Sequence, residues 1–249
     1  EAVERCWGQL RWLEDPPVWE IGGVRGVTSK RDILFAAAAN VDEAMLRRFY
    51  DRVATVFSEK DPTWGLTAEE IGQRSIEVPD RPRFSDSLRR GMVDTLVFLS
   101  VYGKTLFGHC SDFDGGKAAV AVLRQILVPM SAERWETNNR WLPFFAEAAP
   151  ELFLSLCEAD VRQPQSVLKQ LMRPVENALF APCPKSGVLW ALEGAAWEKA
   201  TFARAVYLLA QLDEWSVDDN YGNTPRHSLQ GIFRRWMPQT SADADLRFK

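Results

Sequence analysis

The sequence has few of the residues from which catalytic and metal sites are usually built. Its 249 residues include two histidines, His109 and His227, and four cysteines. No two cysteines form a CxxC pair, and none stands at zinc-finger spacing from a histidine. We therefore expect no metal, no cofactor and no disulfide framework. Reduced, mostly buried thiols in a cytoplasmic protein are the simplest interpretation.

Long apolar runs and a net basic charge are also missing. No segment approaches the ~18 uninterrupted apolar residues of a membrane-spanning helix. The formal net charge is −4, which argues against a dedicated nucleic-acid binder. The chain shows no signal peptide, begins without an initiator methionine and ends in a pattern that still reads as helix. We expect a fragment of a longer protein, truncated at both ends.

Segments that partly match catalytic or metal-binding motifs each lack a required residue. Residues 103–105 read Gly-Lys-Thr, as at the end of a P-loop, but Phe98 stands where that loop needs glycine. Asp112 and Asp114 are spaced like the start of a calcium-binding loop, whereas its twelfth position is Leu123 and not glutamate. No Gly-x-Ser-x-Gly elbow is present. We therefore predict that this part of the protein is not an enzyme.

Helical periodicity dominates what is present. Ser29, Asn40, Ser85 and Asp114 stand where N-caps are expected, each before an apolar pattern. The helix that begins after Ser85 becomes apolar all round in its second half, so we expect a buried central helix. A short hairpin is predicted at residues 18–27, where β-branched residues flank two glycines.

The segment 61–83 separates the chain into two helical parts. It is rich in proline and charge, and we expect a surface linker with one short helix at residues 67–73. Residues 1–60 form the N-terminal helices with the hairpin, and residues 84–249 a helical-repeat region. Helices there are predicted to begin near Ala148, Gly187 and Pro225, so that helix pairs recur about every 40 residues. The predicted fold is all-α, either a HEAT- or TPR-like solenoid or an irregular helical array.

Four stretches carry a resemblance to a known group of proteins: ALEGAAW at 191–197, FAEAAPELFL at 145–154, NTPRHSLQGIF at 223–233 and WMPQT at 236–240. They resemble the helical-repeat C-terminal region of large bacterial P-loop NTPases of the STAND type, proteins suspected of a role in phage defence. The resemblance implies that nucleotide-binding and effector domains lie N-terminal to this chain. It also implies that the chain is a sensor or scaffold.

We therefore predict a non-catalytic scaffold or sensor domain that binds a protein partner. Trp64 and Trp215 are candidate anchors, because both are expected in segments between helices. The arginine pairs are further candidates, since several have aromatic neighbours: Arg89, Arg90, Arg234 and Arg235. Two alternatives stay open. A nucleic-acid-binding array would bring these arginines to one face, and an enzyme would assemble its site from distant residues.

Overall fold

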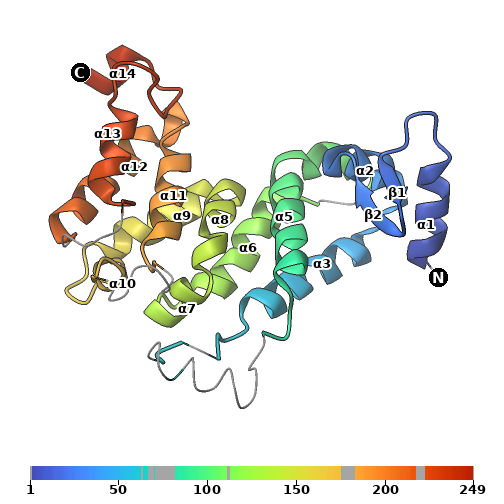
Figure 1. Ribbon diagram of the computed structural model, residues 1–249, viewed down its shortest axis with the longest axis horizontal. Coiled ribbons are helices and arrows are strands. Elements are labelled where there is room, and N and C mark those ends of the chain that lie inside the picture. The colour runs from blue at the N-terminus through green and yellow to red at the C-terminus, as the bar shows by residue number, and fades with distance from the viewer. Residues whose placement is uncertain are drawn as a thin grey trace.

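The computed structural model describes residues 2–62, 64–66, 70, 82–110, 113–174, 183–216 and 222–248. The described chain is mostly helical, with one short two-stranded hairpin, and α1 and α14 lie near opposite ends of its long axis (Figure 1). None of the helices in this part of the chain combines the length and hydropathy that crossing a bilayer requires. Most of segment 61–83, including all of the predicted helix at 67–73 except Glu70, falls outside the described residues.

The elements follow one another in this order: α1 (Ala2–Arg11), β1 (Val18–Ile21), β2 (Val24–Val27), α2 (Lys30–Ala37), η1 (Ala38–Asn40), α3 (Glu43–Phe57), α5 (Asp86–Leu106), α6 (Gly115–Leu127), α7 (Ala132–Thr137), η2 (Asn139–Trp141), α8 (Leu142–Ala148), α9 (Pro150–Asp160), α10 (Val167–Leu171), α11 (Ser186–Ala195), α12 (Lys199–Trp215), α13 (Pro225–Ile232) and α14 (Ala244–Phe248).

The predicted hairpin is confirmed. β1 and β2 are antiparallel, and Gly22 and Gly23 form the turn between them with φ of +58° and +80°. Positive φ at both central residues is the requirement of the tight turn that suits a twisted hairpin. Gly26 is needed for a different reason. The indole of Trp19 lies across it, and a Cβ there would stand 2.2 Å from the ring.

Side-chain caps fix where most of the predicted helices begin. Ser29, Ser85 and Asp114 each accept a hydrogen bond from a backbone amide three residues ahead, as their sequence positions predicted. The prediction for Asn40 was wrong. Asp42 caps α3 instead, accepting from the amide of Met45 at 2.7 Å, because residues 38–40 form a separate 3-10 turn.

One hydrophobic core joins α3 to the helices that follow segment 61–83. α5 packs against α6 and α8, α3 packs against α6, and α11 packs against α8. Val53, Leu96, Ile126 and Leu192, from four different helices, are all completely buried. The expectation that the second half of α5 is buried all round was wrong at Val101. That side chain is 59% exposed, because the packed helices leave one side of α5 open.

Helices in the C-terminal half begin close to where they were predicted. α9 begins at Pro150, α11 at Ser186 and α13 at Pro225. The helices that follow them have 5, 17 and 5 residues in α10, α12 and α14, so the lengths do not show a repeat of constant form. Asp160, at the end of α9, is 7% exposed and caps α10 from outside. It accepts from the Ser166 hydroxyl at 2.6 Å and from two backbone amides at 2.9 Å.

Candidate functional site

Arg89, predicted to bind a partner, is a structural residue. It is 6% exposed, and its guanidinium forms an ion pair with Glu59 and lies 5.6 Å from the ring centroid of Phe57. The same Glu59 carboxylate accepts from the Arg83 amide at 2.8 Å. A buried arginine that already has its carboxylate is not available to a second molecule.

Arg90 is accessible, but its charge is balanced. Its Nε lies 3.0 Å from a carboxylate oxygen of Asp94, one helical turn away. The guanidinium also stacks over the ring of Phe144, at 4.5 Å from the centroid. These contacts fit the interpretation of arginines on helices as salt-bridged, solvated side chains.

The two predicted tryptophan anchors differ in position. Trp64 lies in a turn outside any helix, as expected, and is 43% exposed. The placement of Trp215 between helices was wrong, because it is the last residue of α12. Its side chain is partly buried against the core, and the Lys169 ammonium lies 5.8 Å from its ring centroid. Of the two, Trp64 is therefore the more accessible.

Arg234 and Arg235 lie just beyond the C-terminus of α13, and both are exposed. Neither side chain forms an ion pair or hydrogen bond with any other residue that the structure describes. Next to them, Trp236 is 80% exposed and Met237 is 77% exposed. Residues 234–237, called here the 234–237 loop, thus expose two unpaired cations and two large apolar side chains in succession.

Trp236 and Met237 are not where helical periodicity alone would place them. Their spacing from Leu229 and Phe233 continues a helical stripe, a pattern typical of a buried helix face. The helix instead ends at Ile232. Pro238 disfavours helical conformation at Met237, but the helix ends five residues earlier, and the sequence offers no clear signal for that ending.

Both flanks of the 234–237 loop are tied to the folded body. On the near side, Arg247 donates to the carbonyl of Arg234 at 2.9 Å. On the far side, the amide of Gln239 donates to the carbonyl of Gly231 at 3.0 Å. The buried Thr240 follows, with its hydroxyl donating to the carbonyl of Ala196 at 2.6 Å. The loop is therefore short and anchored at each end.

Met237 has a strained backbone. Its φ is +51°, and it is the one non-glycine residue with positive φ in the part of the chain that the structure describes. A residue with a Cβ in this region costs of order 1 kcal/mol or more, and such strain persists only where the surroundings impose it. Here the strained residue lies between the two sets of hydrogen bonds that hold the flanks of the loop.

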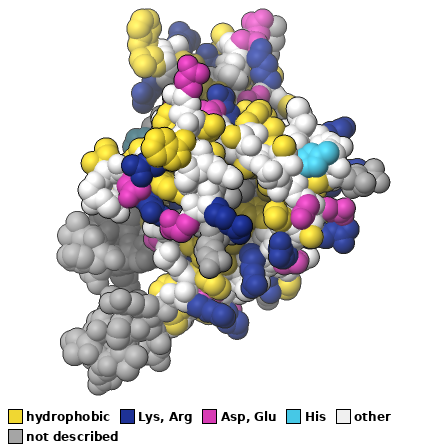
Figure 2. Space-filling view, turned by 90° about the vertical axis from the view of Figure 1, so that its right-hand side faces the viewer, with side chains coloured by type: hydrophobic (Ala, Val, Ile, Leu, Met, Phe, Trp, Pro, Cys, Tyr) yellow, Lys and Arg dark blue, Asp and Glu magenta, His cyan; other side chains and the backbone are white. Residues whose placement is uncertain are grey.

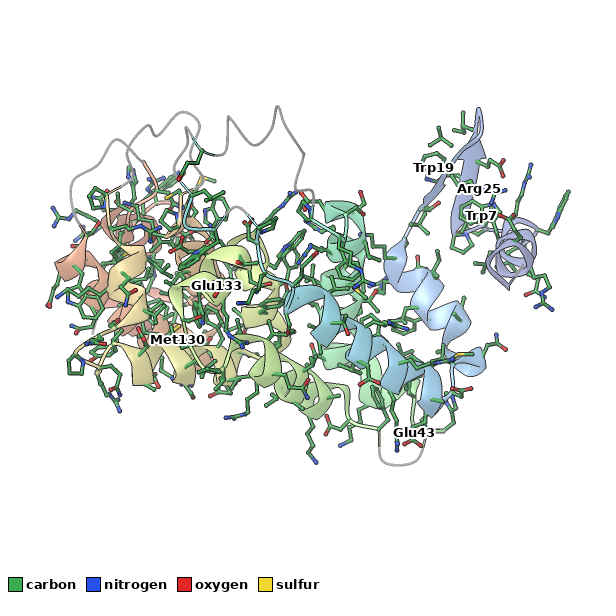
Figure 3. The ribbon with its side chains drawn as sticks, turned by 90° about the horizontal axis from the view of Figure 1, so that it is seen from below. Trp7, Trp19, Arg25, Glu43, Met130 and Glu133 are labelled. Carbon is green, nitrogen blue, oxygen red and sulfur yellow. The ribbon has the colours of Figure 1, made fainter. Side chains whose placement is uncertain are left out.

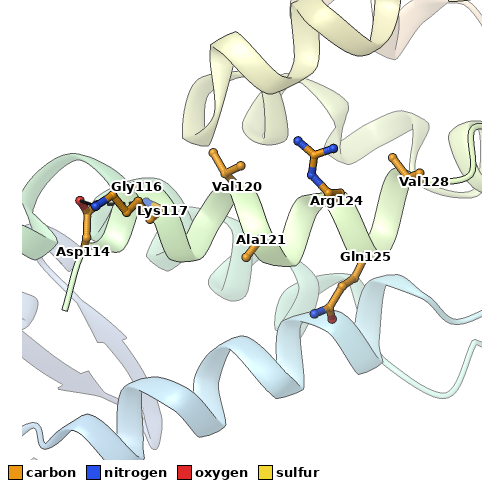
Figure 4. A pocket seen from close by; sticks show the side chains of 8 residues that line it. All are labelled: Asp114, Gly116, Lys117, Val120, Ala121, Arg124, Gln125 and Val128. Carbon is orange, nitrogen blue, oxygen red and sulfur yellow. Dashed lines mark hydrogen bonds and ion pairs between the residues drawn. The ribbon is translucent and has the colours of Figure 1, made fainter. Parts of the chain in front are cut away.

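A hollow runs along α6 and has a volume of about 820 Å³ (Figure 4). It is shallow and mostly apolar, and its charged side chains are Asp114, Lys117 and Arg124. Asp114 accepts from the amide of Lys117 at 3.0 Å, and this hydrogen bond lowers the pKa of the carboxyl below its ordinary value. An ionised helix cap of this kind is not placed for acid–base work.

The histidines and cysteines are dispersed. His109 Nε2 lies 3.0 Å from the carbonyl of Val41, and the exposed His227 lies in the first turn of α13. Cys110, Cys157 and Cys183 are free thiols, and complete burial raises the pKa of Cys157 well above its ordinary value. No group of three or more His, Cys, Asp or Glu side chains suited to a metal ion occurs among the described residues.

A second exposed apolar area lies at the opposite end of the molecule. There Trp7, Trp19 and Arg25 are close together, away from Met130 and Glu133 in the body (Figure 3). Arg25 lies 5.4 Å from the Trp7 centroid and forms an ion pair with Glu4 at 2.7 Å. Ile21 and Val24, which are also exposed, lie on the same face of the hairpin as Trp19. From this end, hydrophobic patches are interrupted by charged side chains (Figure 2).

No protein-family model matches the chain, and no curated protein or solved structure matches it significantly.

Proposed function

We propose that this chain is a helical module that binds a protein partner through the 234–237 loop. One observation carries the proposal: Trp236 and Met237 are 80% and 77% exposed on a loop whose two flanks are tied to the core. Contiguous exposed apolar side chains next to charged ones are a common mark of protein interaction sites. Tryptophan and arginine are also the residues most often found at the energetic centres of protein interfaces.

The hydrogen bonds at the two flanks of the loop lower the entropy cost of binding a partner. A loop that is already held in one conformation loses little conformational entropy when a partner covers it. The αL backbone at Met237 and the hydrogen bond between Gln239 and Gly231 hold the loop before any partner arrives.

A protein partner is favoured over nucleic acid, because several other arginines are ion-paired within the protein. Arg47 pairs with Glu43, Arg89 with Glu59 and Arg90 with Asp94, so these cations are balanced within the protein. Non-specific nucleic-acid binding draws its affinity from many lysines and arginines that neutralise successive phosphates. In a chain of net charge −4, the two adjacent cations of the loop supply little of that.

We further propose that the helices form an irregular array and serve as a scaffold or sensor within a larger cytoplasmic protein. The support is the resemblance of stretches such as residues 191–197 and 223–233 to STAND-type NTPases. In that setting the 234–237 loop receives the partner, and the chemistry resides in other domains. A full-length sequence with a Walker motif upstream of Glu1 would support this placement.

The binding proposal is tested with matched tryptophan variants. We expect Trp236→Ala to fold like the wild type, because the side chain is mostly exposed, and to lose about tenfold or more of its affinity for the partner. The control is Trp12→Ala, since Trp12 is 85% exposed at the other end of the molecule. Proteins retained from extract by immobilised wild type and both variants are quantified by mass spectrometry, and each candidate is then purified for calorimetry.

Support for the proposal is a purified protein that binds the wild type and the Trp12→Ala variant but binds Trp236→Ala at least about tenfold more weakly. A set of retained proteins that does not depend on Trp236 contradicts it.

A further inference from the structure

The charges of the 234–237 loop indicate the kind of partner it fits. We infer that the partner presents an acidic segment that carries at least one large apolar side chain, so that carboxylates meet Arg234 and Arg235 while the apolar side chain covers Trp236 and Met237. This inference rests on the proposed function and adds to it the chemistry of the partner.

The positive charge of the loop is uncompensated, whereas the cations around it are engaged. Lys199 pairs with Asp243 at 2.7 Å, and Arg226 pairs with Asp213 at 3.2 Å. Arg247 donates to backbone carbonyls. Arg234 and Arg235 alone in this group have no such partner among the described residues. Two neighbouring guanidinium groups prefer planar anions, and carboxylates accept from them in pairs of hydrogen bonds.

The apolar half of the loop restricts the anion further. Trp236 provides a wide flat surface, and Met237 is an unbranched side chain that adapts to partners of different shape. A partner with only acidic side chains would leave Trp236 and Met237 exposed to water. A nucleic acid would stack on Trp236, but the net charge of −4 opposes a polyphosphate and gives it few cations to neutralise.

The experiment uses the whole chain and three short synthetic peptides. The first is built from glutamate with leucine at helical spacing, the second has lysine in place of glutamate, and the third has serine in place of leucine. A single-stranded oligothymidylate is the nucleic-acid probe. Binding is followed by NMR through the ¹⁵N indole resonance of Trp236, which is identified by its absence from the spectrum of Trp236→Ala. This resonance reports on the loop even when affinity is low.

We expect the glutamate–leucine peptide to shift the Trp236 indole resonance and the other three probes to shift it weakly or not at all. Arg234→Gln with Arg235→Gln should weaken this binding by about tenfold or more, because each exposed ion pair contributes up to about fivefold. Raising the salt above the physiological ~0.15 M should weaken it as well. The charge-matched control, Arg48→Gln with Arg52→Gln on α3, removes two exposed arginines elsewhere and should leave binding unchanged.

The outcomes separate the two proposals. If the glutamate and lysine peptides bind equally, or if replacing both loop arginines leaves binding unchanged, the inference of an acidic partner is overturned. The loop remains a binding site in either case. Preferential binding of oligothymidylate overturns the acidic partner in favour of nucleic acid. Binding of the glutamate–leucine peptide that leaves the Trp236 resonance unmoved places the contact elsewhere, and contradicts both the inference and the proposed binding loop.

Discussion

Gly115 and Gly116, the first two residues of α6, should respond in opposite ways to replacement by alanine. A Cβ on Gly115 would lie 1.8 Å from the backbone oxygen of Leu99 on α5. A Cβ on Gly116 would meet its nearest neighbour, the Asp114 carboxylate, at 3.4 Å, which is an ordinary contact. The two substitutions are chemically identical and adjacent, so their difference measures the close approach of α5 and α6.

The expected cost at Gly115 follows from the clash. To restore a contact near 3.5 Å, α6 must move away from α5 by roughly 1.5 Å. A gap of even 0.5–1 Å forfeits about a quarter to a half of the attraction between facing atoms, and a backbone oxygen cannot turn aside as a side chain can. We therefore expect Gly115→Ala to cost about 3 kcal/mol, the upper end of the usual range for overpacked sites. Gly116→Ala should be neutral or stabilise by up to about 1 kcal/mol, because alanine favours helix.

Thermal and urea unfolding followed by circular dichroism measure both variants. For a chain of this size a loss of about 3 kcal/mol lowers Tm by roughly 6–12 °C. We expect that decrease for Gly115→Ala and none for Gly116→Ala. If the two variants unfold within about 1 °C of each other, the reasoning is refuted, because α5 and α6 would then not be in close contact at Gly115.

Three further predictions concern the C-terminal half. Phe233 packs edge-on against Phe202 and is partly buried. Phe233→Ala should therefore lower the free energy of unfolding in urea by about 2–3 kcal/mol, less than the ~3–5 kcal/mol of a fully buried phenylalanine. A neutral result would mean that this contact does not form. Asp160→Ala should cost about 2–4 kcal/mol by the same assay, because it leaves two backbone amides near α10 without an acceptor; a loss below about 1 kcal/mol would contradict the cap. The hydrogen bond from Arg204 lowers the pKa of Glu158, so this contact stabilises the fold above the ordinary glutamate range and is lost as the pH falls through the lowered pKa. Glu158→Gln should therefore lower Tm more at pH 7 than at a strongly acidic pH, and an equal effect at both pH values would count against the ion pair.

Local sequence signals predicted local structure well. Ser29, Ser85 and Asp114 were recognisable caps because the capping hydrogen bond spans three residues and needs no distant partner. The glycine pair at 22–23 predicted the hairpin for the same reason. The prediction for Asn40 was wrong because Asp42 competes for the same role two residues later, and the sequence contains no signal for the 3-10 turn that ends at Asn40.

The candidate binding site depended on long-range contacts, and there the sequence was less informative. Arg89 and Arg234 both belong to arginine pairs near aromatic residues, yet one is buried and the other exposed. What distinguishes them is Glu59, which is distant from Arg89 in sequence and meets it only after α3 and α5 have packed. Trp236 and Met237 satisfied a helical period but lie beyond the end of the helix, so periodicity alone misassigned them.

Glu59, at one end of segment 60–82, contacts residues beyond the other end, and this predicts where the chain tolerates insertions. One of its carboxylate oxygens binds the Arg83 amide and the other binds Arg89, so the two ends of segment 60–82 meet at a single side chain. Closing a longer loop costs only about 0.6 kcal/mol for each doubling of its length. The core between α3 and α6 does not depend on how many residues lie between those ends. A tag or a whole domain inserted there, or a cut that divides the chain in two, should leave the packed helices together, which makes this segment the natural place to split the protein into complementing halves.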